Sequence, residues 1–206
     1  MKSPFALSQL NAEVSNKNTN LNYEAALISL AREGVSVNTR KIYIPVIDIE
    51  APMTLYEFID HIVTYSKEKE KYDPIDLIVS TYGGDSYGML GLIDVIKTAP
   101  MPINTIGVGG VFSAGAWVLA AGTGVRKLHK NAFVMVHQFR GGQDGTMLEI
   151  EQTTKHFKQI QKRAEALLAE FTNKDEKYWN VACKKEYYID AEKAKEIGLV
   201  DELIEW

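Results

Sequence analysis

Two short segments contain the side chains best suited to covalent chemistry. Ser113 stands in Gly110-Val-Phe-Ser-Ala-Gly-Ala-Trp117, and His137 stands in Met135-Val-His-Gln138. A serine hydroxyl is a poor nucleophile at neutral pH until a base removes its proton, and histidine is the side chain best tuned to do so. If these two side chains meet in the folded chain, the chemistry is that of a hydrolase.

Taken singly, these residues have ordinary explanations as well. A serine before a helix is commonly an N-cap, and a histidine at the end of a strand is commonly structural. Gly83-Gly84 allows a tight turn, or it allows a backbone N–H to approach a developing oxyanion closely. The sequence has no phosphate-loop ending after these glycines, no His-Glu-x-x-His and no cysteine cluster. We therefore expect neither a metal ion nor a cofactor.

Composition limits the class of protein. The 206 residues are 46% hydrophobic and 24% charged, which predicts a soluble globular protein with one hydrophobic core. With 23 basic and 27 acidic residues, the chain lacks the strong positive charge that nucleic acid requires. No apolar stretch is long enough to cross a membrane, and the start of the chain has no sustained apolar region. The single cysteine, Cys183, fits a reducing compartment as a structural thiol, so we expect a cytoplasmic protein with no membrane or nucleic-acid partner.

The middle of the chain alternates between strand and helix patterns. Strands are predicted at 76–80, 103–108 and within 125–136, and helices at 87–98 and 114–121. This alternation is typical of an α/β fold with parallel strands. Ligands of such folds bind beyond the carboxyl ends of the strands, where both glycine turns fall.

The outer segments have clear helical signals. A capping box, Thr54 and Glu57, predicts a helix from 54 to about 70. A helix from 146 to 171 has one apolar seam, and its remaining faces are expected to be solvated. Asp190 is expected to cap the last helix. Residues 1–20 are predicted to be a flexible arm, a short helix is expected at 22–34, and 21–206 are expected to form one domain.

In order and spacing, five segments resemble the Clp proteolytic subunit, a family of self-compartmentalising serine proteases. They are Ser80-Thr-Tyr-Gly-Gly-Asp-Ser-Tyr-Gly-Met89, the Ser113 segment with Leu119-Ala-Ala-Gly122, the His137 segment with Gly141-Gly142, Asp190-Ala-Glu-Lys-Ala194, and Ile197-Gly-Leu-Val-Asp201. The resemblance covers roughly residues 40 to 204. It implies a spiral of β-α-β units of the Clp and crotonase type, with a protruding handle helix at about 146–172.

The resemblance also implies roles for individual residues. Ser113 would be the nucleophile and His137 the general base, with the backbone N–H groups of Gly84 and Ala114 as the oxyanion hole. Substrate would be bound by Gly83, Phe139, Gly141 and Gly142. The family further implies a heptameric or tetradecameric homo-oligomer, unfolded polypeptide substrates and an AAA+ unfoldase partner.

The sequence departs from the family at several positions. Glu186 stands where the family has an aspartate, so it is the expected third member of the triad. Tyr82 and Phe139 replace prolines, Ala114 replaces a methionine, and the interval from Ser113 to His137 is one residue short. We interpret the chain as a divergent member, such as one encoded by a phage.

Three alternatives stay open from the sequence. They are an inactive Clp-like ring subunit, a phage capsid-processing protease, and a crotonase-type protein acting on acyl-CoA, against which the Ser/His pair argues. A Glu186 carboxylate bonded to His137 would favour catalysis, and one turned to solvent would favour the inactive subunit.

Overall fold

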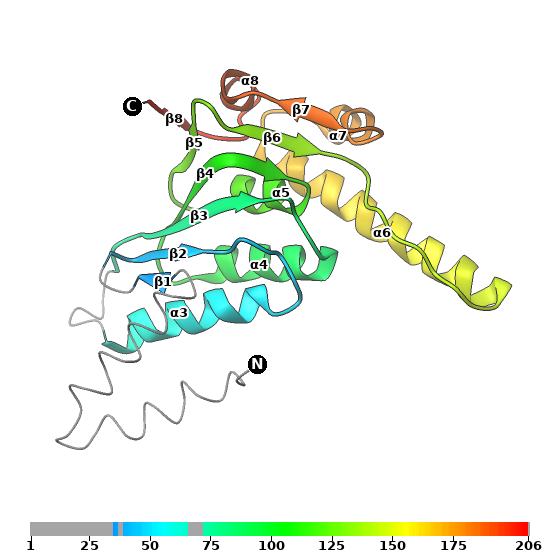
Figure 1. The fold of residues 1–206 in the computed structure, drawn as a ribbon, viewed down its shortest axis with the longest axis horizontal. Helices are drawn as coiled ribbons and strands as arrows, with labels where there is room; N and C mark the ends of the chain where they lie inside the picture. Colours follow the sequence, from blue (N-terminus) through cyan, green and yellow to red (C-terminus); the bar gives the residue numbers. More distant parts are fainter. Residues whose placement is uncertain (1–34, 37–38, 66–71, 206) are drawn as a thin grey trace, which may run out of the picture.

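A computed structural model describes residues 35–36, 39–65 and 72–205 of the chain (Figure 1). The predicted arm at 1–20, the helix expected at 22–34 and the expected domain boundary between 20 and 21 lie outside the described residues. The single domain expected at 21–206 therefore stays a prediction.

The described residues form a sheet whose strands run mainly parallel. Its strands are β1 (Val35–Ser36), β2 (Lys41–Tyr43), β3 (Ile75–Thr81), β4 (Ile103–Phe112), β5 (Arg126–His129), β6 (Phe133–Val136), β7 (Tyr187–Ile189) and β8 (Glu202–Ile204). The order is β1-β2-β3-β4-β5-β8, and β6 pairs with β4 and β7. Among these pairs, only β1–β2 and β6–β7 are antiparallel. The predicted α/β class with a parallel sheet is confirmed.

The central strand β4 changes neighbours along its length. Thr105–Gly107 pair with β5, whereas Gly110–Phe112 pair with β6. The register with β3 also shifts between Val79 and Thr81. Because β6 runs parallel to the last residues of β4 and pairs with them, the carboxyl ends of these two strands lie together. The residues that follow them, 113 and 137, are therefore brought to the same place.

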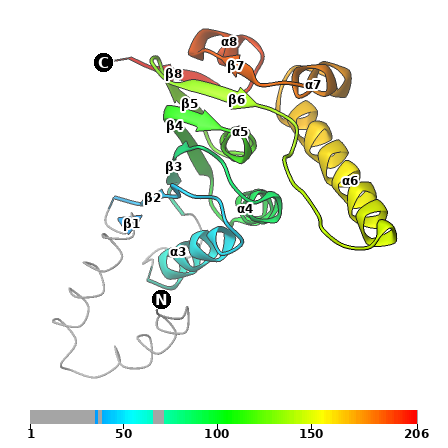
Figure 2. The ribbon, with the colours of Figure 1, turned by 45° about the vertical axis from the view of Figure 1, so that its right-hand side comes forward.

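Six helices are described: α3 (Ala51–Tyr65), α4 (Ser86–Thr98), α5 (Ala114–Ala120), α6 (Met147–Phe171), α7 (Glu176–Ala182) and α8 (Ala191–Glu196). Helices α3, α4 and α5 lie on the same side of the sheet (Figure 2). Every residue of α5 is buried, and its Trp117 is fully enclosed. Burying a large apolar side chain contributes about 1.5–3 kcal/mol, so α5 is held firmly in the core.

The predicted start of α3 is wrong. The helix begins at Ala51, and the Asp48 carboxylate accepts hydrogen bonds from the N–H groups of Glu50 and Ala51. Pro52 is tolerated because a proline in the first turn lacks only an N–H that has no helical partner. Thr54 is therefore inside the helix, and its hydroxyl donates to the Glu50 carbonyl.

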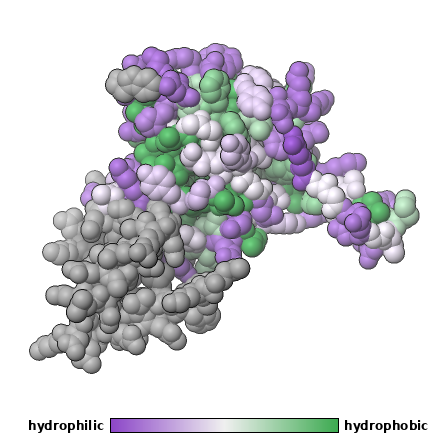
Figure 3. All heavy atoms as spheres, in the orientation of Figure 1, coloured by the Kyte–Doolittle hydropathy of each residue, from purple (hydrophilic) through white to green (hydrophobic). Residues whose placement is uncertain are grey.

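The long helix α6 matches its predicted bounds closely. Thr146 accepts from the Glu149 N–H, and the Glu149 side chain accepts from the Thr146 N–H. Buried residues in α6 begin only at Ile160, and Met147 is 82% exposed. The first half of α6 accordingly projects from the body of the molecule (Figure 1). In Figure 3, apolar side chains lie among hydrophilic ones at this projecting end.

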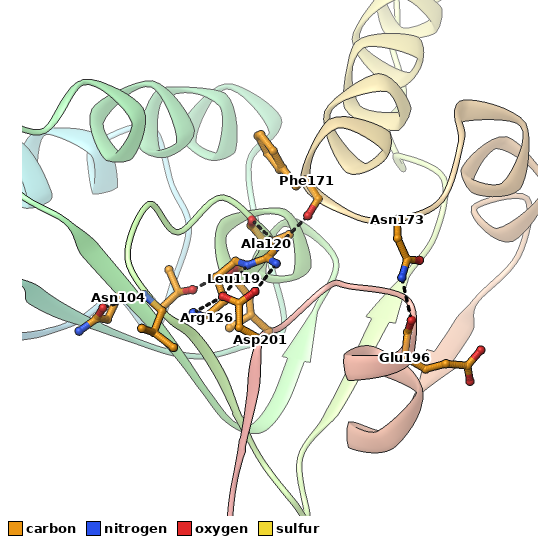
Figure 4. A network of polar contacts seen from close by, with 10 residues as sticks. Asn104, Leu119, Ala120, Arg126, Phe171, Asn173, Glu196 and Asp201 are labelled. Atoms are coloured by element: carbon orange, nitrogen blue, oxygen red, sulfur yellow. Dashed lines mark hydrogen bonds and ion pairs between the residues drawn. The ribbon is translucent and has the colours of Figure 1, made fainter.

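A polar network joins the elements on the side of the sheet where β5 begins (Figure 4). Arg126 donates to both carboxylate oxygens of Asp201 and, at 2.6 Å, to the Phe171 carbonyl at the end of α6. The Asp201 carboxylate also accepts the Arg126 N–H. One guanidinium thus links β5, the end of α6 and the residue before β8.

Candidate active site

Ser113 occupies the sharp turn between β4 and α5. Its φ is 53° and its ψ is −128°, a conformation that residues other than glycine rarely adopt and that costs about 1–3 kcal/mol. Its N–H donates to the Met135 carbonyl at 2.7 Å, which ties the turn to β6. The side chain makes no capping hydrogen bond, so the ordinary interpretation as an N-cap is wrong. The hydroxyl is held at a strained strand-to-helix turn, as nucleophiles often are.

The glycine pair 83–84 lies directly against this turn. A Cβ on Gly83 would be 2.5 Å from the Ser113 Cβ, and one on Gly84 would be 1.9 Å from the Ile47 carbonyl oxygen. Both residues also have positive φ, 107° and 153°. Only glycine therefore fits at either position, and the turn is fixed by close packing against Ser113 and Ile47.

The backbone N–H groups of Gly84 and Ala114 are available beside Ser113. The bridge between Ile47 and Gly84 uses the Gly83 carbonyl and the Asp85 N–H, so it leaves the N–H of Gly84 unused. Ala114 is the first residue of α5, and its N–H has no acceptor within the helix. Two such donors near a candidate nucleophile are what an oxyanion hole requires.

Ser113 and His137 line one cavity of about 760 Å³. Its lining also includes Gly84, which was predicted to belong to the oxyanion hole, and Phe139 and Gly141, which were predicted to bind substrate. The remaining lining comes from the start of α4, from 138–140 and from α6, namely Asp85, Ser86, Tyr87, Gln138, Arg140, Thr154, Phe157, Lys158 and Gln161. Gly83 packs behind Ser113 rather than lining the cavity, and Gly142 is exposed beyond it.

His137 follows the end of β6 directly. Its Nδ1 lies against the carbonyl oxygen of Gln138. Among the described contacts, no hydrogen bond joins His137 to Ser113 or to Glu186. The fold therefore brings the predicted nucleophile and base to one cavity, while the imidazole is turned towards its own backbone.

Glu186 is engaged by groups other than His137. Arg140 donates to its Oε1, and the Tyr188 hydroxyl donates to its Oε2 at 3.1 Å. These two hydrogen bonds hold the pKa of Glu186 below its usual value, with His137 contributing a smaller electrostatic effect. Glu186 is thus near His137 but is neither bonded to it nor simply turned to solvent.

No pattern in the sequence indicates Arg140 as a partner of Glu186, because the two are 46 residues apart. The sequence patterns also do not predict the contact between α4 and α6, two walls of the cavity. There the Tyr87 hydroxyl of α4 lies 2.5 Å from His156 Nε2 on α6. Cys183, by contrast, is buried as expected, and its burial raises the pKa of the thiol to about 12. It therefore stays protonated and is not a nucleophile.

Other binding modes find little support in the described part of the chain. Within it, no group of three or more His, Cys, Asp or Glu side chains is arranged to hold a metal ion. None of its helices is both long and apolar enough to cross a membrane.

Comparison with known proteins gives the class of this fold and site. A sequence model of the family described as Clp protease matches residues 38–206. The ATP-dependent Clp protease proteolytic subunit 1 of Salinibacter ruber is 33% identical over 141 residues, 68% of this chain and 60% of that protein. The ATP-dependent Clp protease proteolytic subunit of Bacteroides thetaiotaomicron is 30% identical over 132 residues, 63% of this chain and 60% of that protein.

The chain therefore belongs to the Clp protease family. The resemblance seen in the sequence is confirmed at this level. The matches span 60% of the length of each relative, less than two thirds.

Proposed function

We propose that this chain is an active serine endopeptidase that cleaves peptide bonds in unfolded polypeptides, with Ser113 as nucleophile and His137 as general base. The observation that carries the proposal is the strained turn at Ser113, whose side chain caps no helix and lines the same cavity as His137. A strained residue with no stabilising role for its side chain favours a catalytic one.

The reaction follows from these positions. His137 takes the hydroxyl proton as the Ser113 oxygen attacks the scissile carbonyl, and the N–H groups of Gly84 and Ala114 stabilise the resulting oxyanion. The C–N bond then breaks as His137 passes the proton to the leaving amine, which leaves an acyl ester on Ser113. Water repeats the cycle and releases the acid. Phe139, Gly141 and Gly142 would hold the substrate backbone beside Ser113.

Glu186 is proposed to orient His137 by accepting a hydrogen bond from the imidazole once the ring turns away from the Gln138 carbonyl. A glutamate can hold an imidazole in this way, since Ser-His-Glu arrangements occur on other folds. The proposal extends to a homo-oligomeric chamber of one or two seven-membered rings, an AAA+ unfoldase partner and a cytoplasmic location, all of which rest on the family.

The second candidate is a catalytically inactive structural subunit of a Clp-like ring. It is favoured by the bonds of Glu186 to Arg140 and Tyr188, together with the turn of His137 towards Gln138. In this case the strain at Ser113 would be a remnant without a present role.

Labelling with a fluorophosphonate probe separates the two candidates. The probe forms a covalent bond only with an activated serine, so we expect the wild-type chain to be labelled and Ser113→Ala to be unlabelled. The variant Ser86→Ala, at a half-buried serine that lines the same cavity, controls for loss of a cavity hydroxyl and should keep its label. If the assembled wild-type protein is not labelled, the chain is the inactive subunit.

A further inference from the structure

The segment that carries His137 is held by a side chain of the long helix. Phe139, two residues after His137, donates its N–H to Gln161 Oε1 at 2.9 Å. Gln161 belongs to the half of α6 that packs on the body of the molecule, and it also lines the cavity. The bond therefore joins a rigid helix to the irregular stretch between β6 and α6.

A buried carboxylate fixes the orientation of Gln161. Its amide nitrogen donates to Glu165 Oε1 at 2.8 Å, and Asn180 of α7 donates to Glu165 Oε2 at 3.0 Å. A carboxylate accepts only and a backbone N–H donates only, so the amide of Gln161 fits between Phe139 and Glu165 in one orientation. Glu165 is 6% exposed, and a buried carboxylate needs such partners to offset its lost hydration.

The same stretch is also held from the side of α5. The ring of Phe139 lies 6.0 Å from that of Trp117, centroid to centroid. Trp117 in turn donates its indole N–H to the Ala164 carbonyl of α6 at 2.8 Å. The backbone and the ring of Phe139 are therefore both anchored to the core, one through Gln161 and the other through Trp117.

We infer that Gln161 is a positioning residue for His137, oriented by Glu165 and acting through the N–H of Phe139. The inference rests on the proposed function, because it assigns Gln161 to the same site. It also gives a reason for the departure at 139: the proline of the resembled family has no N–H to donate. In this chain the backbone hydrogen bond supplies the restraint that the proline ring would give.

Exchanging the two polar groups tests the inference. Gln161→Met removes the acceptor and leaves the N–H of Phe139 unpaired, whereas Gln161→Glu places a second carboxylate against Glu165. Adding Glu165→Gln to Gln161→Glu keeps an acceptor for Phe139, removes the repulsion between the two carboxylates and restores a donor between positions 161 and 165. Gln159→Met is the matched control, since Gln159 is an exposed glutamine of the same helix.

The readouts are the maximal rate of fluorophosphonate labelling and the hydrogen exchange of the 137–142 amides. Both are taken at a temperature at which circular dichroism shows every variant to be folded. We expect Gln161→Met to slow labelling by about tenfold to a hundredfold, because small displacements of a catalytic group have effects of this size. Hydrogen exchange of the 137–142 amides should rise in Gln161→Met and in Gln161→Glu. Both readouts should return towards wild type in the double variant that combines Gln161→Glu with Glu165→Gln.

The outcomes are distinct. A Gln161→Met variant that is labelled at the rate of wild type and Gln159→Met overturns the inference alone. The inference is also overturned if the double variant, Gln161→Glu with Glu165→Gln, is labelled as slowly as Gln161→Glu alone. A wild-type chain that is not labelled overturns the proposed function, and the role assigned to Gln161 in catalysis falls with it.

Discussion

At the scale of single residues, the proposed peptidase activity depends on which groups the two carboxylate oxygens of Glu186 bind. Each already accepts a hydrogen bond, one from Arg140 and one from Tyr188, so His137 would share the carboxylate with these two donors. Bonds from a charged guanidinium are the stronger kind, and Arg140 is therefore the main competitor of His137. Arg140 is itself 73% exposed, so the competing bond lies within reach of water.

Replacing Arg140 by glutamine should raise activity. We expect Arg140→Gln to speed fluorophosphonate labelling at neutral pH by about threefold to tenfold, because loss of a charge-assisted bond frees Glu186 for His137. The pKa of Glu186 should also rise towards its usual value, since Arg140 is the largest cause of its lowering. The acid limb of the labelling rate would then move to higher pH.

Arg163→Gln, at an exposed position of α6, serves as the control for charge removal. Adding Glu186→Gln to Arg140→Gln should abolish the gain. A fall in labelling with Arg140→Gln would mean that the guanidinium holds Glu186 in place for catalysis instead.

The residue types in the sequence predicted part of this candidate site and missed the rest. Ser113 and His137 were predicted because few side chains can serve as an activated nucleophile and its base. Glu165 was expected on a solvated face of its helix, and this expectation is wrong because α7 folds over it. Arg140 and Gln161 act through partners 46 and 22 residues away, and no local pattern records such pairs.

At the scale of elements, the sequence predicted helix starts from capping residues, and one such prediction is confirmed while another is wrong. Asp190 caps α8 as expected, accepting from the Lys193 N–H. The Thr54 and Glu57 motif failed because Asp48 begins α3 three residues earlier. The short elements α7 and β7 were not predicted, since their few residues are stabilised by tertiary contacts rather than by periodicity.

The Arg126 network should make stability depend on pH. Hydrogen bonds from Arg126 lower the pKa of Asp201, so the folded state favours its ionised form. Such a carboxylate stabilises the fold fully above its unfolded pKa, near 4, and loses this contribution as the pH falls through its folded value. Because the Asp201 side chain is 42% exposed, we expect Asp201→Asn to cost about 1 kcal/mol at pH 7.

Urea unfolding followed by circular dichroism measures this change. The difference between wild type and Asp201→Asn should be full at about pH 7 and should shrink at about pH 3. Glu202→Gln, in the more exposed pair with Lys127, is the matched control and should change little. A difference that stays constant with pH would show that packing, not charge, is lost.

At the scale of the whole molecule, the projecting half of α6 is the feature that a single chain does not explain. Met147 and Leu148 are 82% and 63% exposed, and no described residue of this half is buried. Exposed apolar side chains on a projecting helix are typical of an interaction surface, and the proposed homo-oligomer would bury them against another copy. The family implies that such a contact joins two rings.

Charge at this end should prevent that contact. We expect Met147→Glu with Leu148→Glu to reduce the mass of the assembly to about half, because burying a charge in an apolar interface is unfavourable. Sedimentation velocity gives the mass, and Gln152→Glu on the exposed surface of the same helix is the control. An unchanged mass would exclude this end of α6 from the interface.

The hydrogen bond from the Ser113 N–H to the Met135 carbonyl has a consequence for biosynthesis. Ser113 leaves the ribosome before β6, the strand that holds its turn, and Glu165 and Glu186 leave the ribosome later still. A nascent chain that has formed β3, β4 and α5 therefore has no completed site. The proposed peptidase chemistry would therefore become available only when most of the polypeptide has been made.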